Sequence, residues 1–398
     1  MLGYRDNYED VLNYHPGGVD QDSAYKTSIQ ARLRKYEESQ LAGSEIQYRC
    51  PKCRLCKDCK CPEKTTSIKQ EVEQHVIDNS VTINVKEAVV MAELPLISDP
   101  VVKLAPNKDI ARKVYDQQVK KLSKKEEDRQ SVIKSEAKLQ ELGYVEYVKN
   151  LTFEQQKQLE ESPIQNHLVW RFVHKTNSTT TPCRLVFDAS MATASGNSLN
   201  DIVAKGTNNL NKLAEIYARW RIHKVAYHND VNKMYNTVSL HSKHWCLQRY
   251  LWEPSLDPNM EPLQKVIKTI IYGVKSSGNQ AECALRKTAE MFKEDYPEVY
   301  EVIMKDYYVD DCLSGEPTDQ QANQRMDELE LVLNQTGITL KGFTLSGKDP
   351  DKTLSADGES IPVAGHKWFS KGDLVGFDIK DLNFAKKRRG RKDFENSK

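Results

Sequence analysis

Two adjacent aspartates, Asp310 and Asp311, follow a short apolar and aromatic run, Tyr307-Tyr308-Val309. The polar residues Ser314-Gly315-Glu316-Pro317 come soon after them, so we expect a strand, a tight turn and a second strand. Neighbouring side chains in a strand point to opposite faces of the sheet. Only a turn at this point can therefore direct both carboxylates to one site.

A third aspartate, Asp230, follows the apolar run Val225-Ala226-Tyr227 and opens the segment Asp230-Val231-Asn232-Lys233-Met234-Tyr235. Carboxylates at the ends of two strands suit a two-magnesium site, because Mg²⁺ prefers oxygen ligands and bridges protein carboxylates to substrate phosphates. That chemistry is phosphoryl or nucleotidyl transfer. An Asp-Asp pair taken alone is equally compatible with an ordinary solvated turn.

The chain has 398 residues, enough for two or three domains, and its formal net charge is only +1. Any binding of nucleic acid must therefore depend on local positive charge. No apolar run approaches the roughly 20 residues that span a bilayer, so no membrane partner is expected. The start, Met1-Leu2-Gly3-Tyr4-Arg5-Asp6, lacks the pattern of a signal peptide, which favours an intracellular, cytoplasmic protein.

Five of the nine cysteines fall within twelve residues, interleaved with Lys and Arg: Cys50, Cys53, Cys56, Cys59 and Cys61. Four thiolates are able to hold a tetrahedral zinc ion, and the candidate ligands are Cys50, Cys53, Cys56 and Cys59. Their spacing overlaps, whereas a zinc ribbon separates two Cys-x-x-Cys pairs by a loop. This spacing is equally compatible with a small zinc- or nucleic-acid-binding module and with a loop of reduced thiols. An iron–sulfur site is a third alternative.

A basic segment, Lys386-Lys387-Arg388-Arg389-Gly390-Arg391-Lys392, lies near the C-terminus. Such a segment is able to bind phosphate backbone or act as a nuclear address, which would add nuclear access to the cytoplasmic location. A solvated tail is the alternative.

Residues 168–174 and 183–188 are expected to form a hairpin, with Lys175 at one end of its polar connection and Arg184 just beyond the other. These two cations are candidates for closing over a triphosphate, with Arg184 supplying fork-like hydrogen bonds. The alternative is an ordinary surface hairpin. A further phosphate-loop candidate, Gly342-Phe343-Thr344-Leu345-Ser346-Gly347-Lys348, is rejected because Asp349 stands where Ser or Thr is required.

Several blocks together resemble the reverse transcriptase of BEL/Pao long-terminal-repeat retrotransposons. In chain order they are Arg184-Leu185-Val186-Phe187-Asp188-Ala189-Ser190, Gly196-x-Ser198-Leu199-Asn200-Asp201, Asp230-x4-Tyr235, Tyr272-Gly273-x-x-Ser276-Ser277 and Tyr308-Val309-Asp310-Asp311. The resemblance implies an α+β right-hand polymerase, with fingers, an antiparallel palm sheet backed by helices and a partial thumb. It divides the chain into an irregular Cys-rich N-terminal region with a linker (1–106), fingers and palm (107–350), and the start of thumb or connection with a basic tail (351–398).

The resemblance also implies roles for single residues. Asp230, Asp310 and Asp311 would be the catalytic carboxylates, with Asp230 and Asp310 binding two Mg²⁺ ions and Asp311 supporting the site. The implied substrate-binding residues are Arg184, Lys175, Tyr235 as the gate against ribonucleotides, Gly273, Tyr308, and Lys348 near the leaving pyrophosphate. The implied activity is RNA-directed DNA polymerisation, a nucleotidyl transfer that uses an RNA or DNA template, a DNA primer and deoxynucleoside triphosphates.

This sequence departs from the family pattern in two ways. Gly278-Asn279-Gln280 stands where the family usually has proline and an apolar residue after the Ser-Ser pair. The sequence also shows no aspartic-protease motif and nothing like RNase H or integrase. The alternative function is therefore a truncated, catalytically silent transposon remnant that binds nucleic acid.

Overall fold

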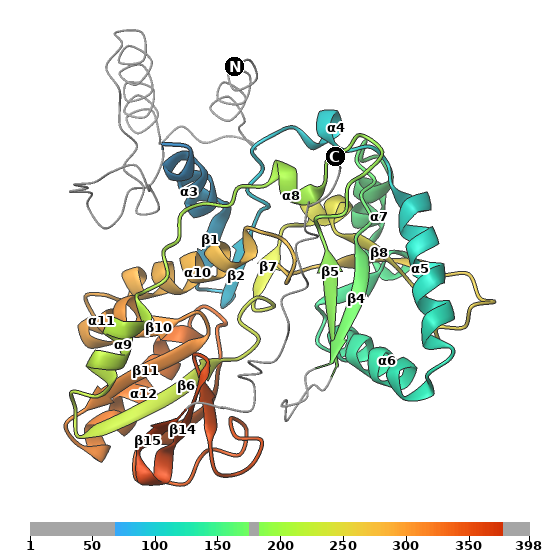
Figure 1. Ribbon diagram of the computed structural model, residues 1–398. Coiled ribbons are helices and arrows are strands. Elements are labelled where there is room, and N and C mark those ends of the chain that lie inside the picture. Colours follow the sequence, from blue (N-terminus) through green and yellow to red (C-terminus); the bar gives the residue numbers. More distant parts are fainter. Residues whose placement is uncertain (1–67, 175–182, 377–398) are drawn as a thin grey trace, which may run out of the picture.

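The computed structural model describes residues 68–174 and 183–376, which form a mixed α+β structure of helices and small, mostly antiparallel sheets (Figure 1). This confirms the α+β class. The cysteine cluster, Lys175 and the basic segment 386–392 lie outside the described residues, so their roles stay predictions. Within the described ranges, no helix combines the length and the apolar character needed to cross a membrane.

A four-stranded antiparallel sheet occupies one part of the molecule (Figure 1). Its strands, in spatial order, are β10 (Tyr307–Tyr308), β11 (Asp311–Glu316), β6 (Val225–Val231) and β12 (Leu340–Leu345). Alternate residues of β6 belong to different cores: Val225 and Tyr227 pack among helices, whereas Ala226 packs in a second cluster. Both faces of this central strand are therefore covered, which explains its nearly continuous burial.

Three helices cover one face of this sheet: α10 (Ser277–Met291), α11 (Pro297–Lys305) and α12 (Asp319–Asn334). Local signals account for their starts. The Thr318 side chain accepts a hydrogen bond from the Gln321 amide at the start of α12, and Pro297 opens α11, where its missing N–H costs nothing.

The opposite face is covered by α9 (Leu213–Trp220) and a three-stranded antiparallel sheet, β13 (Ile361–Val363), β14 (His366–Phe369) and β15 (Leu374–Gly376). Trp220 and Trp368 meet edge to face at 5.1 Å, and both are fully buried. Residues 361–376 thus pack directly on the central sheet.

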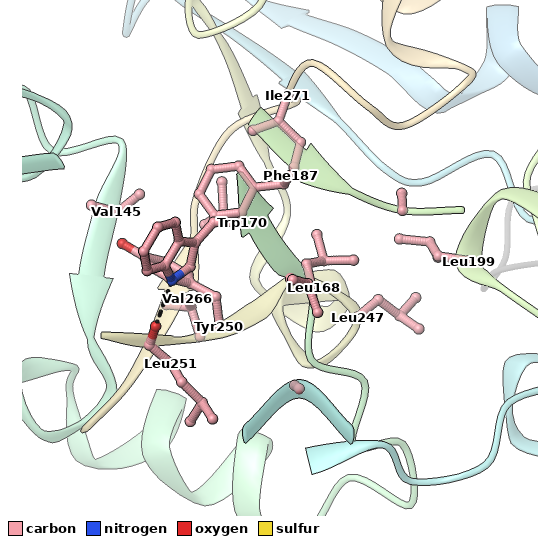
Figure 2. Packing of buried hydrophobic residues seen from close by; sticks show 14 of the residues in the cluster. Val145, Leu168, Trp170, Phe187, Leu199, Leu247, Tyr250, Leu251, Val266 and Ile271 are labelled. Carbon is pink, nitrogen blue, oxygen red and sulfur yellow. Dashed lines mark hydrogen bonds between the residues drawn. The ribbon is translucent and has the colours of Figure 1, made fainter. Parts of the chain in front are cut away.

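A second part of the molecule contains α5 (Lys108–Leu122), α6 (Glu126–Glu141), α7 (Phe153–Glu160) and two small sheets. One sheet is the hairpin β4 (Val169–His174) and β5 (Cys183–Asp188), as expected from the sequence; the other has the order β3 (Val145–Tyr147), β9 (Leu263–Ile267), β8 (Arg249–Trp252). Figure 2 shows their shared core, where the Trp170 indole N–H donates to the Leu251 carbonyl at 3.1 Å.

The segment expected to be a linker is structured where the model describes it. It contains α3 (Ile68–Ser80), β1 (Val81–Asn84), β2 (Val89–Ala92) and the short helix α4 (Pro100–Lys103). Strand β2 pairs in parallel with β7 (Val238–Leu240), and α3 packs on α10. At the start of α4, Asp99 caps the helix by accepting a hydrogen bond from the Val101 amide.

A buried ion pair offers a test of how the second part is stabilised. Lys265 is 0% exposed, and its ammonium group pairs with Glu136, which also accepts a hydrogen bond from the Tyr250 hydroxyl at 2.7 Å. Burial lowers the pKa of Lys265. Removing one partner of such a pair leaves an uncompensated charge in the core.

We expect Lys265→Met to lower the free energy of unfolding by about 3–5 kcal/mol. The measurement is chemical denaturation followed by tryptophan fluorescence, because Trp170 and Trp252 lie in the same core. The control is Lys138→Met, which breaks an exposed pair with Glu141 and should change stability by less than about 1 kcal/mol. Equal effects of the two substitutions would contradict this account of the buried pair.

Candidate active site

The expected strand, turn and strand at the paired aspartates are present. Strands β10 and β11 form a hairpin in which Tyr308 pairs with Asp311, so Val309 and Asp310 make a two-residue turn. Val309 has φ +59°, a conformation that is strained for a β-branched residue and costs about 1–3 kcal/mol. The turn is held because the Asp310 carbonyl accepts a hydrogen bond from the Val231 amide of β6 at 2.8 Å.

The three aspartates of the sequence analysis converge at this turn. Asp311 on β11 lies opposite Asp230 on β6 in the antiparallel register, so their side chains project from the same face, and the turn adds Asp310. One carboxylate oxygen from each of the three lies within 4.8 Å of the others, and all three residues are half-buried. Three carboxylates at this spacing suit a hard divalent cation such as Mg²⁺.

Both oxygens of the Asp311 carboxylate have hydrogen-bond partners. Oδ1 lies 2.9 Å from Nε2 of His228, and Oδ2 accepts the backbone N–H of Ala364 at 3.0 Å. Ala364 lies in the turn between β13 and β14. Nearby on α9, burial raises the pKa of the Tyr217 hydroxyl to about 12, with the negative charge of Asp311 as a second cause.

Two tyrosines form an aromatic pair beside the aspartates. The rings of Tyr235 and Tyr272 are 4.2 Å apart between centroids, and Tyr272 is 41% exposed. Burial raises the pKa of both hydroxyls, that of Tyr272 to about 12, and the charge of Asp310 adds to the shift in each case. The positive charge of Arg184 on β5 lowers the pKa of Tyr272, so the Arg184 guanidinium lies on the same side of the molecule.

Gly273 joins this aromatic pair to the hairpin. It has φ +112°, and a Cβ at this position would lie 1.9 Å from the carbonyl oxygen of Phe187 in β5. The side-chain N–H of Asn200 donates to the Gly273 carbonyl at 2.9 Å. The side-chain oxygen of Asn200 accepts a hydrogen bond from the backbone N–H of Lys275. Asn200 and Gly273 therefore fix the 272–275 loop against the end of β5.

Of two further residues expected to bind substrate, Lys348 lies away from the aspartates, whereas Tyr308 pairs with Asp311 across the hairpin. Lys348 follows the end of β12 that pairs with Tyr227, away from Asp230, and its ammonium group is 3.1 Å from Asp319 at the start of α12. The half-buried Tyr308 packs against the core cluster that contains Trp220 and Trp368. The structure therefore does not bring Lys348 together with the aspartates.

Other residues of the site were not found from the sequence. Lys341 lies opposite Asp230 on β12, and His228 contacts Asp311. Neither belongs to a recognisable motif, because both relationships depend on which strands pair and in which register. Asn200 was visible only as a member of the block Gly196-x-Ser198-Leu199-Asn200-Asp201, without an assigned role.

Comparison with known proteins adds no assignment: a scan against protein-family models finds no match, and a search among curated proteins finds none either. The case for a function therefore rests on the residues of this site and on their geometry.

The close approach at Gly273 gives a direct test of the site's architecture. We expect Gly273→Ala to destabilise the protein by about 1–3 kcal/mol and to displace the loop, because only glycine tolerates this φ and the carbonyl of Phe187 leaves no room for a Cβ. Thermal unfolding is the measurement.

The matched control is Gly278→Ala, at the second residue of α10. Its Cβ would meet only the Tyr235 hydroxyl, at an ordinary 3.6 Å, so the substitution should be neutral or stabilise by up to about 1 kcal/mol. If Gly273→Ala melts at the temperature of the control, the loop is not held as described.

Proposed function

We propose that this chain is the RNA-directed DNA polymerase core of a retrotransposon, a nucleotidyltransferase that extends a DNA primer with deoxynucleotides on an RNA or DNA template. The observation that carries the proposal is the convergence of Asp230, Asp310 and Asp311 at the meeting point of a central strand and a hairpin turn. The family resemblance of the blocks in the sequence supports it independently. In this reading the four-stranded sheet with α10–α12 is the palm, and the part with the β4–β5 hairpin is the fingers.

The donor set fits Mg²⁺, because it consists of carboxylate oxygens alone. Asp230 and Asp310 would hold two ions, which when bound lower the pKa of the primer 3′-hydroxyl and offset the charge on the phosphates. In the reaction the primer 3′-oxygen bonds to the α-phosphorus, the bond from that phosphorus to the β-phosphate oxygen breaks, and pyrophosphate leaves. Both oxygens of Asp311 are held beside these groups by hydrogen bonds.

The remaining residues of the proposed site bind and orient the nucleotide. Arg184 is exposed on β5, on the side of the Tyr272 ring, and its guanidinium suits the oxygens of a triphosphate. Tyr235 and Tyr272 present a surface of two packed aromatic rings next to Asp310, which suits the sugar of an incoming nucleotide. Gly273 holds this surface against the fingers.

The first test is Mg²⁺-dependent extension of a DNA primer on an RNA template. We expect the native chain to extend the primer, and we expect Asp230→Asn and Asp310→Asn to lose at least about a hundredfold in rate, since each removes a proposed metal ligand and its charge. Both variants should bind primer–template as the native chain does, which controls for folding.

Full-strength extension by Asp310→Asn would overturn the proposed mechanism. Salt-sensitive binding of nucleic acid without extension by any form of the chain would instead favour the catalytically silent remnant.

A second test concerns the proposed gate. Replacing Tyr235 by Ala removes the ring that packs against Tyr272 and opens space beside the proposed position of the nucleotide sugar. We expect the efficiency of ribonucleotide incorporation relative to deoxynucleotide incorporation to rise about tenfold or more, as judged by kcat/KM for the two substrates. If the ratio stays at the native value while deoxynucleotides are still used, another side chain excludes the 2′-hydroxyl.

A further inference from the structure

His228 is a buried polar residue that the proposed mechanism does not use. It lies on β6 two residues before Asp230, and therefore on the same face of the sheet. It is 1% exposed, and its Nε2 lies 2.9 Å from Oδ1 of Asp311 on the neighbouring strand. The other oxygen of Asp311 is held by the Ala364 amide, so the carboxylate is fixed at both ends.

The chemistry of the contact assigns its direction. An ionised carboxylate only accepts hydrogen bonds, so Nε2 of His228 carries the hydrogen and donates a hydrogen bond to Asp311. The second ring nitrogen, Nδ1, is buried and has no hydrogen-bond partner in the structure. A buried polar atom without a partner costs about 1–3 kcal/mol.

An apolar side chain at this position of a buried strand would avoid that cost. The histidine is therefore a poor choice for packing alone, and a buried unsatisfied group of this kind calls for an explanation. Among residues 68–174 and 183–376, the one polar contact of its ring is the bond from Nε2 to Asp311.

The two hydrogen bonds leave Asp311 able to act. Each carboxylate oxygen has two lone pairs, and a single donor occupies one of them. One lone pair on each oxygen therefore stays available, and one Asp311 oxygen lies within 4.8 Å of an oxygen of Asp230 and of Asp310. The effect of His228 and Ala364 is to fix the plane of the carboxylate in which those lone pairs lie.

We propose that His228 is a positioning residue for the metal centre: its Nε2–H holds the Asp311 carboxylate in the orientation in which it faces a cation bound by Asp230 and Asp310. The inference rests on the proposed function, because it assumes that the three aspartates bind a divalent cation. It assigns His228 no contact with the substrate and no proton transfer. Partners that orient the ligands of a metal typically change metal affinity or activity by 10–100-fold when they are replaced.

The test uses Mn²⁺ as the probe, with its binding to the full chain followed by electron paramagnetic resonance in the absence of nucleic acid. Three substitutions separate the hydrogen bond from packing. His228→Gln keeps an amide N–H at about the reach of Nε2, His228→Asn keeps the polarity but is too short to reach Asp311, and His228→Leu removes the donor. We expect the Asn and Leu variants to bind Mn²⁺ about 10–100-fold more weakly and Gln to stay within about threefold of the native chain.

The matched control is Tyr227→Phe on the adjacent position of β6. The Tyr227 side chain packs on the helix-covered face, opposite to Asp311, so the substitution changes a neighbour of His228 without touching Asp311. Its Mn²⁺ affinity should equal that of the native chain. Should His228→Leu fail to fold, as judged by circular dichroism, the comparison of Asn with Gln decides the question.

Native-like Mn²⁺ binding by the folded Asn or Leu variant would overturn the inference about His228. The Asp310→Asn protein, measured alongside, separates that failure from a failure of the proposed function. If Asp310→Asn loses Mn²⁺ while the His228 variants keep it, the metal centre stands and only the positioning role falls. If the native chain binds no Mn²⁺, both proposals fall together.

Discussion

The pairing of β6 with β11 is the interaction on which the rest of the site depends. Their antiparallel register sets Asp230 opposite Asp311 and, two residues away, brings His228 within reach of the same carboxylate. Because side chains alternate between the faces of a strand, a slip of one residue would send the carboxylates of one strand into the core formed with the helices. Apolar packing on both faces of β6 fixes that register, so burial far from the aspartates determines their geometry.

Contacts of the backbone also link the site to the two neighbouring parts of the molecule. On one side, the Ala364 amide of the β13–β14 turn donates to Asp311, and the edge-to-face tryptophans of α9 and β14 hold that turn in place. On the other side, Gly273 lies against the carbonyl of Phe187, so the aromatic pair beside Asp310 is fixed to the β4–β5 hairpin. The site thus lies where three packed parts of the molecule meet. Each part contributes a backbone contact that side-chain chemistry alone does not supply.

Local signals in the sequence predicted local structure well. The turn at Asp310 and the hairpin that carries Arg184 both follow from short patterns, and both are present. Relationships that depend on strand pairing were missed: the sequence gives no register, so Lys348 was expected near the site and His228 was overlooked. The packing of the segment around α3 was not predicted for a similar reason, because its partners α10 and β7 come far later in the chain.

The position of β6 in the chain has a consequence for how the protein is made. This strand is synthesised well before β11 and β12, and between them the chain builds β7, β8 and β9, which pair in other sheets. Until its neighbours arrive, β6 has two unpaired edges and exposes residues that later enter the core, a combination prone to association with other chains. The nascent polypeptide therefore passes through a stage in which the edges of β6 are open to association, and binding by a chaperone at that stage would favour correct folding.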